Sequence, residues 1–246
     1  MTTPIEIRED AGIRTLHFGS EWVQGAMRIA RPWNLELEYT REMLASLLLI
    51  EEPRKVLQIG LGAASLTRFL YHYYPQMQLT VVEIEPIVIA AARQYFKLPE
   101  DPVRMHLLTG CGAEYMLAST KKFNLILVDG FDQHARAGPL ETLPFYQACR
   151  TRLTDDGVLA VNLLTHSYRA SLGRIMQAFE DRALLFPSCE SGNAIAFATA
   201  GNTIDLSLEQ LKENALALKT QTGLNLLPTL SRLAQAKSCL NNRLVL

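Results

Sequence analysis

The chain alternates short β-branched runs with helical patterns between residues 55 and 200, and this alternation limits the folds that it can adopt. Segments with apolar residues at helical spacing separate the runs, which is typical of βαβ units and a parallel sheet. We therefore predict a doubly wound, mostly parallel seven-stranded Rossmann-like sheet, an α/β fold whose ligand crevice lies at the carboxyl ends of the strands. The expected strands are KVLQIG (55–60), QLTVVEI (78–84), VRMHLLTG (103–110), FNLILVDG (123–130), GVLAVNLL (157–164), ALLFP (183–187) and NAIAFATA (193–200).

The two ends of the chain differ from this central pattern. Three segments before residue 32 alternate like antiparallel strands, and residues 35–50 are predicted to form a helix that leads into the first parallel strand. Near the other end, Ser207 is suited to cap a helix that Gly223 stops, and a second helix follows. We predict an N-terminal β-hairpin segment (1–35), a Rossmann-like ligand-binding domain (36–205) and a C-terminal helical extension (206–246).

Composition excludes several classes of partner. The 246 residues carry 24 basic and 25 acidic side chains, a net charge of −1, so no basic face for nucleic acid is expected. The strongly apolar runs are shorter than the ~20 residues of a membrane span, and the polar start MTTPIEIRED does not resemble a signal peptide, which predicts a cytoplasmic protein. Cysteines and histidines are scattered without metal-ligand spacing, so no metal is expected.

The glycine-containing turn GLGAAS follows the first parallel strand. Gly60 and Gly62 would let the backbone approach a ligand, although a tight structural turn is the alternative. Glu83 ends the next strand about twenty residues after Gly62, which is the offset of a ribose-binding acid in dinucleotide folds. Spacing alone allows a nicotinamide cofactor, but Ser65 stands where the third glycine of that motif belongs.

An adenosyl sulfonium ligand is the other candidate for this turn. Such a ligand needs a ribose acid and a flat slot for adenine after the third strand, but no pyrophosphate cradle. The stretch TGCGAEYM follows the third strand and places Cys111 beside Gly112. The sequence therefore also fits a site for S-adenosylmethionine or its decarboxylated form.

A longer series of motifs resembles the spermidine/spermine synthase family of aminopropyltransferases. The stretches WVQGAMRIA, LELEYTREMLASLLL, IGLGAAS, VVEIEP, TGCGAEYM, LILVDGFD and PFYQACRTRLTDDGVLAVNL follow the family's order over roughly residues 20–165. The resemblance implies a class I methyltransferase-like fold, decarboxylated S-adenosylmethionine as donor, a small-molecule amine or polyamine as acceptor, and a homodimer.

The resemblance also assigns the donor side of the site. The family's glycine-rich loop falls on residues 60–65, where its acid, which holds the aminopropyl end of the donor, is replaced by Ala63. Its ribose acid corresponds to Glu83, which is retained. The acid that meets adenine falls at Cys111, next to Gly112, so backbone contacts and a weak thiol remain there.

The acceptor side is assigned by the family's DSSDP loop, which matches DGFDQ. The resemblance implies that Asp129 helps to take the proton from the attacking amine and that Asp132 holds the polyamine as a cation. Elementary chemistry supports a carboxylate here, because an amine is protonated at pH 7 and must lose a proton before it attacks. The alternative is a strand-ending turn with solvated acids.

The helix before the first parallel strand contains the family's Tyr-Gln position, where this chain has Thr40 and Arg41. Tyr39 is one residue away and on an α-helix would point about 100° aside. Arg41 is a candidate substrate contact, for example to a methionine carboxylate. The alternative is a purely structural ion pair with Glu38 or Asp132. Gln24 matches the family's loop near the adenosine, as a ligand contact or a turn residue.

Three functions follow from these residues. The first is transfer of an aminopropyl group from decarboxylated S-adenosylmethionine to an amine. The second is methyl transfer from S-adenosylmethionine on the same fold. The third is a catalytically inactive nucleoside-binding homologue, since a fold does not fix a function.

Overall fold

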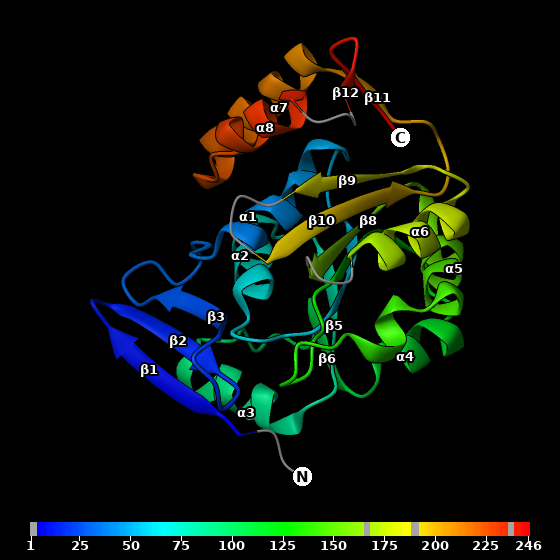
Figure 1. Cartoon of the computed structure of the whole chain (residues 1–246). Helices are drawn as coiled ribbons and strands as arrows, with labels where there is room; N and C mark the ends of the chain where they lie inside the picture. Colours follow the sequence, from blue (N-terminus) through cyan, green and yellow to red (C-terminus); the bar gives the residue numbers. More distant parts are fainter. Residues whose placement is uncertain (1–3, 165–167, 188–191, 236–238) are drawn as a thin grey trace.

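Figure 1 shows the computed structural model of the chain, which describes residues 4–164, 168–187, 192–235 and 239–246. A central sheet lies between helices, a small N-terminal sheet packs beside α3, and the C-terminal helices cover one edge near β9 and β10. Two of the scattered residues considered as metal ligands, His166 and Cys189, lie outside the described residues. Within the described part, no helix combines the length and apolar character needed to cross a membrane.

The central sheet has seven strands in the order β6-β5-β4-β7-β8-β10-β9. The first five run parallel, and β10 is antiparallel to both β8 and β9. This confirms the predicted mostly parallel seven-stranded sheet, and the strand bounds differ from the predicted ones mainly at β8, which starts earlier. The strands are β4 (Lys55–Ile59), β5 (Gln78–Glu83), β6 (Met105–Thr109), β7 (Phe123–Val128), β8 (Leu153–Leu164), β9 (Ala183–Pro187) and β10 (Asn193–Thr199).

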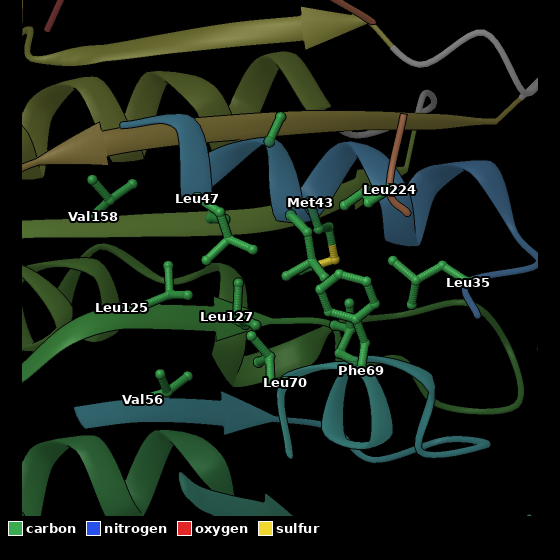
Figure 2. Close-up of a cluster of buried hydrophobic side chains, with 14 of the residues drawn as sticks. Leu35, Met43, Leu47, Val56, Phe69, Leu70, Leu125, Leu127, Val158 and Leu224 are labelled. Carbon is green, nitrogen blue, oxygen red and sulfur yellow. The ribbon is translucent and has the colours of Figure 1, made fainter. Parts of the chain in front are cut away.

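Helices cover both faces of this sheet. The strands are apolar at successive positions because each face is buried: Leu125 and Leu127 of β7 point into one core, and Ile126 and Val128 into the other. Figure 2 shows the first core, where sheet residues meet Phe69 and neighbouring side chains. The helices α2 (Ser65–Tyr73) and α3 (Pro86–Tyr95) contribute to the first core, and α4 (Gly112–Ala118), α5 (Leu143–Arg152) and α6 (Tyr168–Phe179) contribute to the second. A short 3-10 turn, η2 (Gly138–Glu141), precedes α5.

The helix predicted over residues 35–50 is shorter and changes its winding. It consists of α1 (Glu38–Met43) followed by the 3-10 helix η1 (Leu44–Leu48). The hydroxyl of Ser46 donates to the carbonyl oxygen of Met43, three residues earlier, at 2.8 Å. Such a side-chain bond competes with α-helical pairing and matches the tighter 3-10 spacing.

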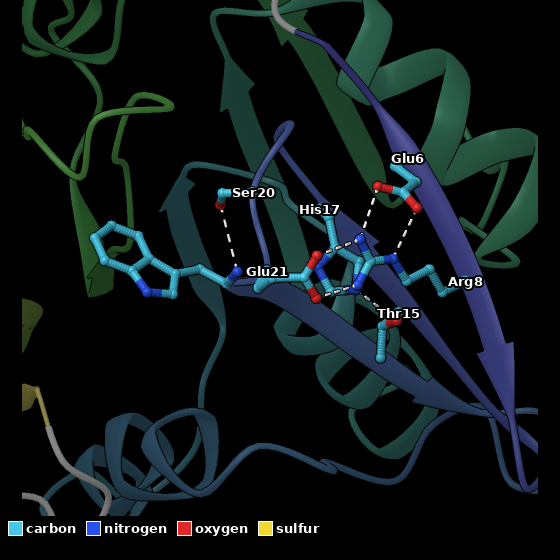
Figure 3. Close-up of polar contacts among 7 residues, drawn as sticks. Glu6, Arg8, Thr15, His17, Ser20 and Glu21 are labelled. Carbon is cyan, nitrogen blue, oxygen red and sulfur yellow. Dashed lines mark hydrogen bonds and ion pairs between the residues drawn. The ribbon is translucent and has the colours of Figure 1, made fainter.

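The N-terminal segment is a three-stranded antiparallel sheet of β1 (Glu6–Asp10), β2 (Ile13–His17) and β3 (Val23–Arg28). The Arg8 guanidinium binds the carboxylate of Glu6 at 2.7 Å and that of Glu21 at 2.6 Å, as Figure 3 shows. Hydrogen bonds from Arg8 hold the pKa of both carboxyls below their ordinary value. This exposed network ties the β2–β3 connection to β1.

The C-terminal extension consists of α7 (Leu208–Thr222), α8 (Leu227–Gln235) and a small sheet of β11 (Asp205–Ser207), β12 (Cys239–Leu240) and β13 (Arg243–Val245). Ser207 and Gln210 form a capping box, and Gly223 ends α7 with a φ of 76°, so the predicted start and stop of this helix are confirmed. The sheet was not predicted. Apolar side chains of both helices join the first core, so this extension packs directly on α1 and η1.

Arg232 of α8 makes the polar link between the extension and α1. Its Nη2 lies 3.2 Å from the Glu38 carboxylate and also binds the carboxylate of Glu42. Glu42 is fully buried, with an exposed fraction of 0%. The arginine therefore neutralises a carboxylate that has no access to water.

Candidate functional site

A cleft of about 410 Å³ opens at the carboxyl ends of β4, β5, β6 and β7. The residues that follow these four strands line it, together with part of the β2–β3 region. Another hollow, of about 540 Å³, is lined by Lys122, Leu153 and Thr154 and lies at the opposite ends of β7 and β8. Because ligands of doubly wound sheets bind beyond the carboxyl ends of the strands, the first cleft is the candidate site.

Gly60 and Gly62 line this cleft, and the surroundings of residue 60 leave no room for a side chain. Its φ is +89°, and a Cβ there would lie 2.0 Å from the carbonyl oxygen of Asp129. The amide of Gln58 donates to the carbonyl oxygen of Gly60 at 2.7 Å, and the hydroxyl of Thr67 donates to Gln58 at 2.8 Å. The glycine turn after β4 is thus held against the turn after β7.

Glu83 lies at the end of β5, lines the cleft and is 7% exposed. Its carboxylate accepts hydrogen bonds from the N–H of Leu61 at 2.8 Å and from the N–H of Glu85 at 2.9 Å. Burial raises the pKa of Glu83, and these backbone hydrogen bonds oppose the rise. One carboxylate therefore connects the glycine turn to the start of α3, with lone pairs left for hydroxyl donors in the cleft.

Ala63 lies outside the residues that line the cleft, so the structure does not bring it together with the other predicted donor contacts. Its side chain is 2% exposed and packs with Leu16, Met27 and Phe96 under the N-terminal sheet. A Cβ on Gly25 of β3 would lie 2.5 Å from the Ala63 methyl group. Strand β3 therefore occupies the space that a larger side chain at residue 63 would need.

Arg68 of α2 is not among the residues that line the cleft, and it binds the backbone of this region. Its guanidinium donates to the carbonyl oxygens of Pro32 at 2.6 Å, of Phe96 at 2.8 Å and of Ala63. The side chain is buried, and burial lowers its pKa. Three chain segments thus meet at one buried cation.

Cys111 and Gly112 line the next part of the cleft, after β6. Cys111 is the N-cap residue of α4 and makes no side-chain capping hydrogen bond. A Cβ on Gly112 would lie 2.3 Å from the Ile59 side chain, so this glycine lets α4 pack on the end of β4. Ile84 and Val88 also line the cleft, and Ile84, which is 60% exposed, offers apolar surface for a flat ring, whereas Val88 is buried.

Asp129 follows β7 and is only partly buried, beside the cleft-lining Gly130. The hydroxyl of Tyr39 donates to Asp129 Oδ2 at 3.2 Å, and the amide of Asn162 donates to Oδ1 at 2.9 Å. Asn193 in turn donates to the Asn162 oxygen at 2.8 Å. Burial raises the pKa of Asp129, while the hydrogen bonds from Asn162 and Tyr39 favour its ionised form.

Asp132 lines the cleft but already binds a cation within the protein. Its Oδ2 accepts from Arg136 Nε at 3.0 Å, and Oδ1 accepts from the N–H groups of His134 at 2.8 Å and of Arg136 at 2.9 Å. Burial would raise the pKa of Asp132, but the bonds from Arg136 and His134 together hold it below its ordinary value. The side chain of Asp132 thus stabilises the turn formed by residues 132–136.

Arg41 is not among the residues that line the cleft, so the structure does not bring it together with the other predicted contacts. Its guanidinium donates to the carbonyl oxygens of Leu35 at 2.9 Å and of Glu36 at 2.6 Å. Of the two acids suggested from the sequence as its partners, Glu38 binds Arg232 and Asp132 binds Arg136. Gln24 does line the cleft, and its carbonyl oxygen is the closest atom to a Cβ placed on Gly62.

Sequence reasoning missed three contributors to this site. Tyr39 was expected to point aside, yet its hydroxyl reaches Asp129. Asn162 did carry a signal in the sequence, because it is a polar residue in the middle of an otherwise apolar strand. The sequence contains no pattern that identifies Arg136, because its ion pair with Asp132 depends on the turn that Asp132 forms.

Taken together, the fold and the cleft define a Rossmann-like protein of the class I methyltransferase type, with an acid at the end of β5 and carboxylates after β7. The family model of the spermine/spermidine synthase domain matches residues 37–179. The polyamine aminopropyltransferase of Chromobacterium violaceum is 34% identical over 233 residues, which are 94% of this chain and 89% of that protein. The chain belongs to the spermine/spermidine synthase family.

A second relative agrees with this assignment, and two solved structures share the fold. The polyamine aminopropyltransferase of Neisseria meningitidis serogroup A is 34% identical over 90% of this chain and 85% of that protein. A probable spermidine synthase from Corynebacterium glutamicum has the same fold, with a TM-score of 0.73 and 20% identity over 90% of this chain and 91% of that one. A human methyltransferase-like protein 13 in complex with SAH also shares the fold, with a TM-score of 0.67 and 22% identity over 76% of this chain and 93% of that chain.

Proposed function

We propose that this chain is an aminopropyltransferase that uses decarboxylated S-adenosylmethionine as donor and a small-molecule amine as acceptor. The observation that carries the proposal is Asp129, which stands after β7 with one oxygen bonded to Tyr39 and the other to Asn162. The relatives named polyamine aminopropyltransferases, which align over most of the chain, support the same reaction.

The reaction is a direct displacement that mainly needs alignment and proton removal. The nitrogen lone pair of the acceptor attacks the aminopropyl carbon bonded to sulfur. The C–S bond breaks, and its electron pair stays on sulfur, so methylthioadenosine leaves as a neutral thioether. Asp129 takes a proton from the amine, either directly or through the Tyr39 hydroxyl that donates to its Oδ2.

The donor fits the first half of the cleft. Glu83 would accept from the ribose hydroxyls, the Gly60–Gly62 turn would pass along the sulfonium side, and Cys111, Ile84 and Val88 would border the adenine. Gln24 contributes from β3. Ala63 has no direct part in this assignment, because its methyl group lies under the N-terminal sheet.

Methyl transfer from S-adenosylmethionine has less support. The basic side chain considered as a partner for a methionine carboxylate was Arg41, and its guanidinium binds backbone carbonyls away from the cleft. The overlap with a methyltransferase-like protein supports a shared fold alone.

Calorimetric titration of decarboxylated S-adenosylmethionine, S-adenosylmethionine and methylthioadenosine tests the donor. We expect the decarboxylated donor to bind, and tight binding of only the carboxylated one would refute the proposal. With donor and putrescine supplied, chromatography should detect methylthioadenosine and an aminopropylated amine. Asp129→Asn should lower kcat by about 100-fold or more while donor binding stays nearly intact. Glu83→Gln is the matched variant, which should weaken donor binding.

The homodimer and the cytoplasmic location stay predictions. Light scattering of the purified chain tests the former.

A further inference from the structure

The acceptor end of the cleft is formed by the loop between β7 and η2. Phe131 in this loop and Pro139 and Leu140 in η2 give it apolar walls. The loop's charged side chains Asp132 and Arg136 also line the cleft, and Asp129 lies beside the lining residue Gly130. A second amine on an acceptor would need a free carboxylate at this end, because a desolvated ammonium group requires a partner.

The carboxylate of Asp132 is occupied on both oxygens. Oδ1 accepts two backbone N–H groups, and Oδ2 accepts Arg136 Nε at 3.0 Å and lies 2.9 Å from Arg136 Nη2. The backbone bonds shape the loop, and the N–H of Asp132 also donates to the Arg136 carbonyl oxygen at 3.0 Å. Hydrogen bonds of main-chain groups therefore hold the turn, and the Arg136 side chain adds the positive charge that neutralises the Asp132 carboxylate.

Within residues 129–140 the sequence contains two carboxylates, and their surroundings differ. Asp129 is bonded to neutral donors only, Tyr39 and Asn162. Asp132 is bonded to a cation. One ammonium group therefore finds an available carboxylate at Asp129, and beyond it the loop offers an ion pair with no net charge and an apolar wall.

We propose that Arg136 is a specificity-determining residue that cancels the charge of Asp132, so that the chain takes primary amines with a short uncharged tail as readily as it takes diamines. This inference rests on the proposed aminopropyl transfer. The acceptor class is then set by one amine at Asp129 and an apolar chain along Phe131 and Leu140.

The test compares two acceptors of equal length. Putrescine carries a second ammonium group where pentan-1-amine carries a methyl group. For the wild-type chain with decarboxylated S-adenosylmethionine, the ratio of kcat/KM for putrescine to that for pentan-1-amine should lie within about threefold of one. In Arg136→Gln the ratio should rise by about two- to fivefold, because an exposed ion pair is worth at most about 1 kcal/mol. Arg136→Lys restores the cation and should keep the wild-type ratio.

Arg243→Gln is the matched control, because Arg243 forms an exposed pair with Asp205 at 2.7 Å in the C-terminal extension. It should leave the acceptor ratio unchanged. Circular dichroism checks that the loop variants stay folded, which is expected because the Arg136 side chain is 68% exposed.

The outcomes separate this inference from the proposed function. A wild-type preference for putrescine of more than about threefold, or an unchanged ratio in Arg136→Gln, overturns the role of Arg136 and leaves aminopropyl transfer standing. If the wild-type chain consumes neither amine while it binds the donor, the proposed transfer itself fails, and the inference fails with it.

Discussion

The hydroxyl of Tyr39 lies 3.2 Å from Oδ2 of Asp129, a contact that joins residues 90 positions apart in the chain. Asn162 donates to the other oxygen of the same carboxylate at 2.9 Å. These two neutral donors stabilise a carboxylate that burial disfavours. Helix α1 and strand β8 thus both determine whether Asp129 is ionised.

Replacement of Tyr39 by phenylalanine should reduce activity and change its pH dependence. Without the hydroxyl, the pKa of Asp129 rises further, so the acidic limb of the kcat/KM profile should move to higher pH. A hydrogen bond to a charged group is worth about 1.5–3 kcal/mol, which predicts a loss of about tenfold or more in kcat/KM. Tyr71→Phe is the control, since that hydroxyl binds Asp101 at 3.0 Å outside the cleft. An unshifted acidic limb in Tyr39→Phe would contradict the prediction.

Asp129→Asn should stabilise the folded chain at neutral pH. Because burial raises the pKa of Asp129, the folded state loses stability as pH rises from the ordinary carboxyl value through the raised one. The asparagine avoids this loss and can still pair with Tyr39 and Asn162. Tm at pH 7 should rise by about 2–4 °C, and the difference should vanish when pH falls below the ordinary carboxyl pKa.

Asp132→Asn provides the comparison of opposite sign. The pKa of Asp132 is lowered, so its stabilisation is present above the ordinary carboxyl value and is lost as pH falls through the lowered one. Its side chain is 41% exposed, so the decrease in Tm at pH 7 should be small. Shifts of the same sign in both variants would show that their pKa directions do not govern stability.

The two positions where family acids are missing should respond differently when an acid is restored. Ala63→Asp would place a carboxylate in the cluster of Leu16, Met27 and Phe96 and should cost about 2 kcal/mol or more. Cys111→Asp, at the N-cap of α4, should instead stabilise by about 0.5–1 kcal/mol. Urea unfolding measures both changes, and equal effects would refute the burial argument.

Arg232→Met should destabilise the chain strongly, because it removes the cation beside the fully buried Glu42. Loss of one partner from a buried pair costs about 3–5 kcal/mol. The double variant Glu42→Met with Arg232→Met should recover most of that loss. Arg243→Met removes an exposed pair from the same extension and should cost at most about 1 kcal/mol. A small effect of Arg232→Met in urea unfolding would contradict the prediction.

The sheet and the Glu83 position could be predicted because they depend on local periodicity. Each strand is apolar over a short stretch, and the acid ends one of them. The contact of Tyr39 with Asp129 could not be predicted, because it depends on how α1 packs against the carboxyl end of β7, 90 residues further along the chain. The burial of Ala63 was equally invisible, since it depends on β3 packing across the turn through Gly25.

Arg68 binds the carbonyl oxygen of Ala63 in the glycine turn and, at the same time, the carbonyl oxygens of Pro32 and Phe96. The shape of that turn is therefore set from outside the cleft. Substitutions at Ile84 and Cys111 should therefore change the lining of the cleft without disturbing the residues that support the turn.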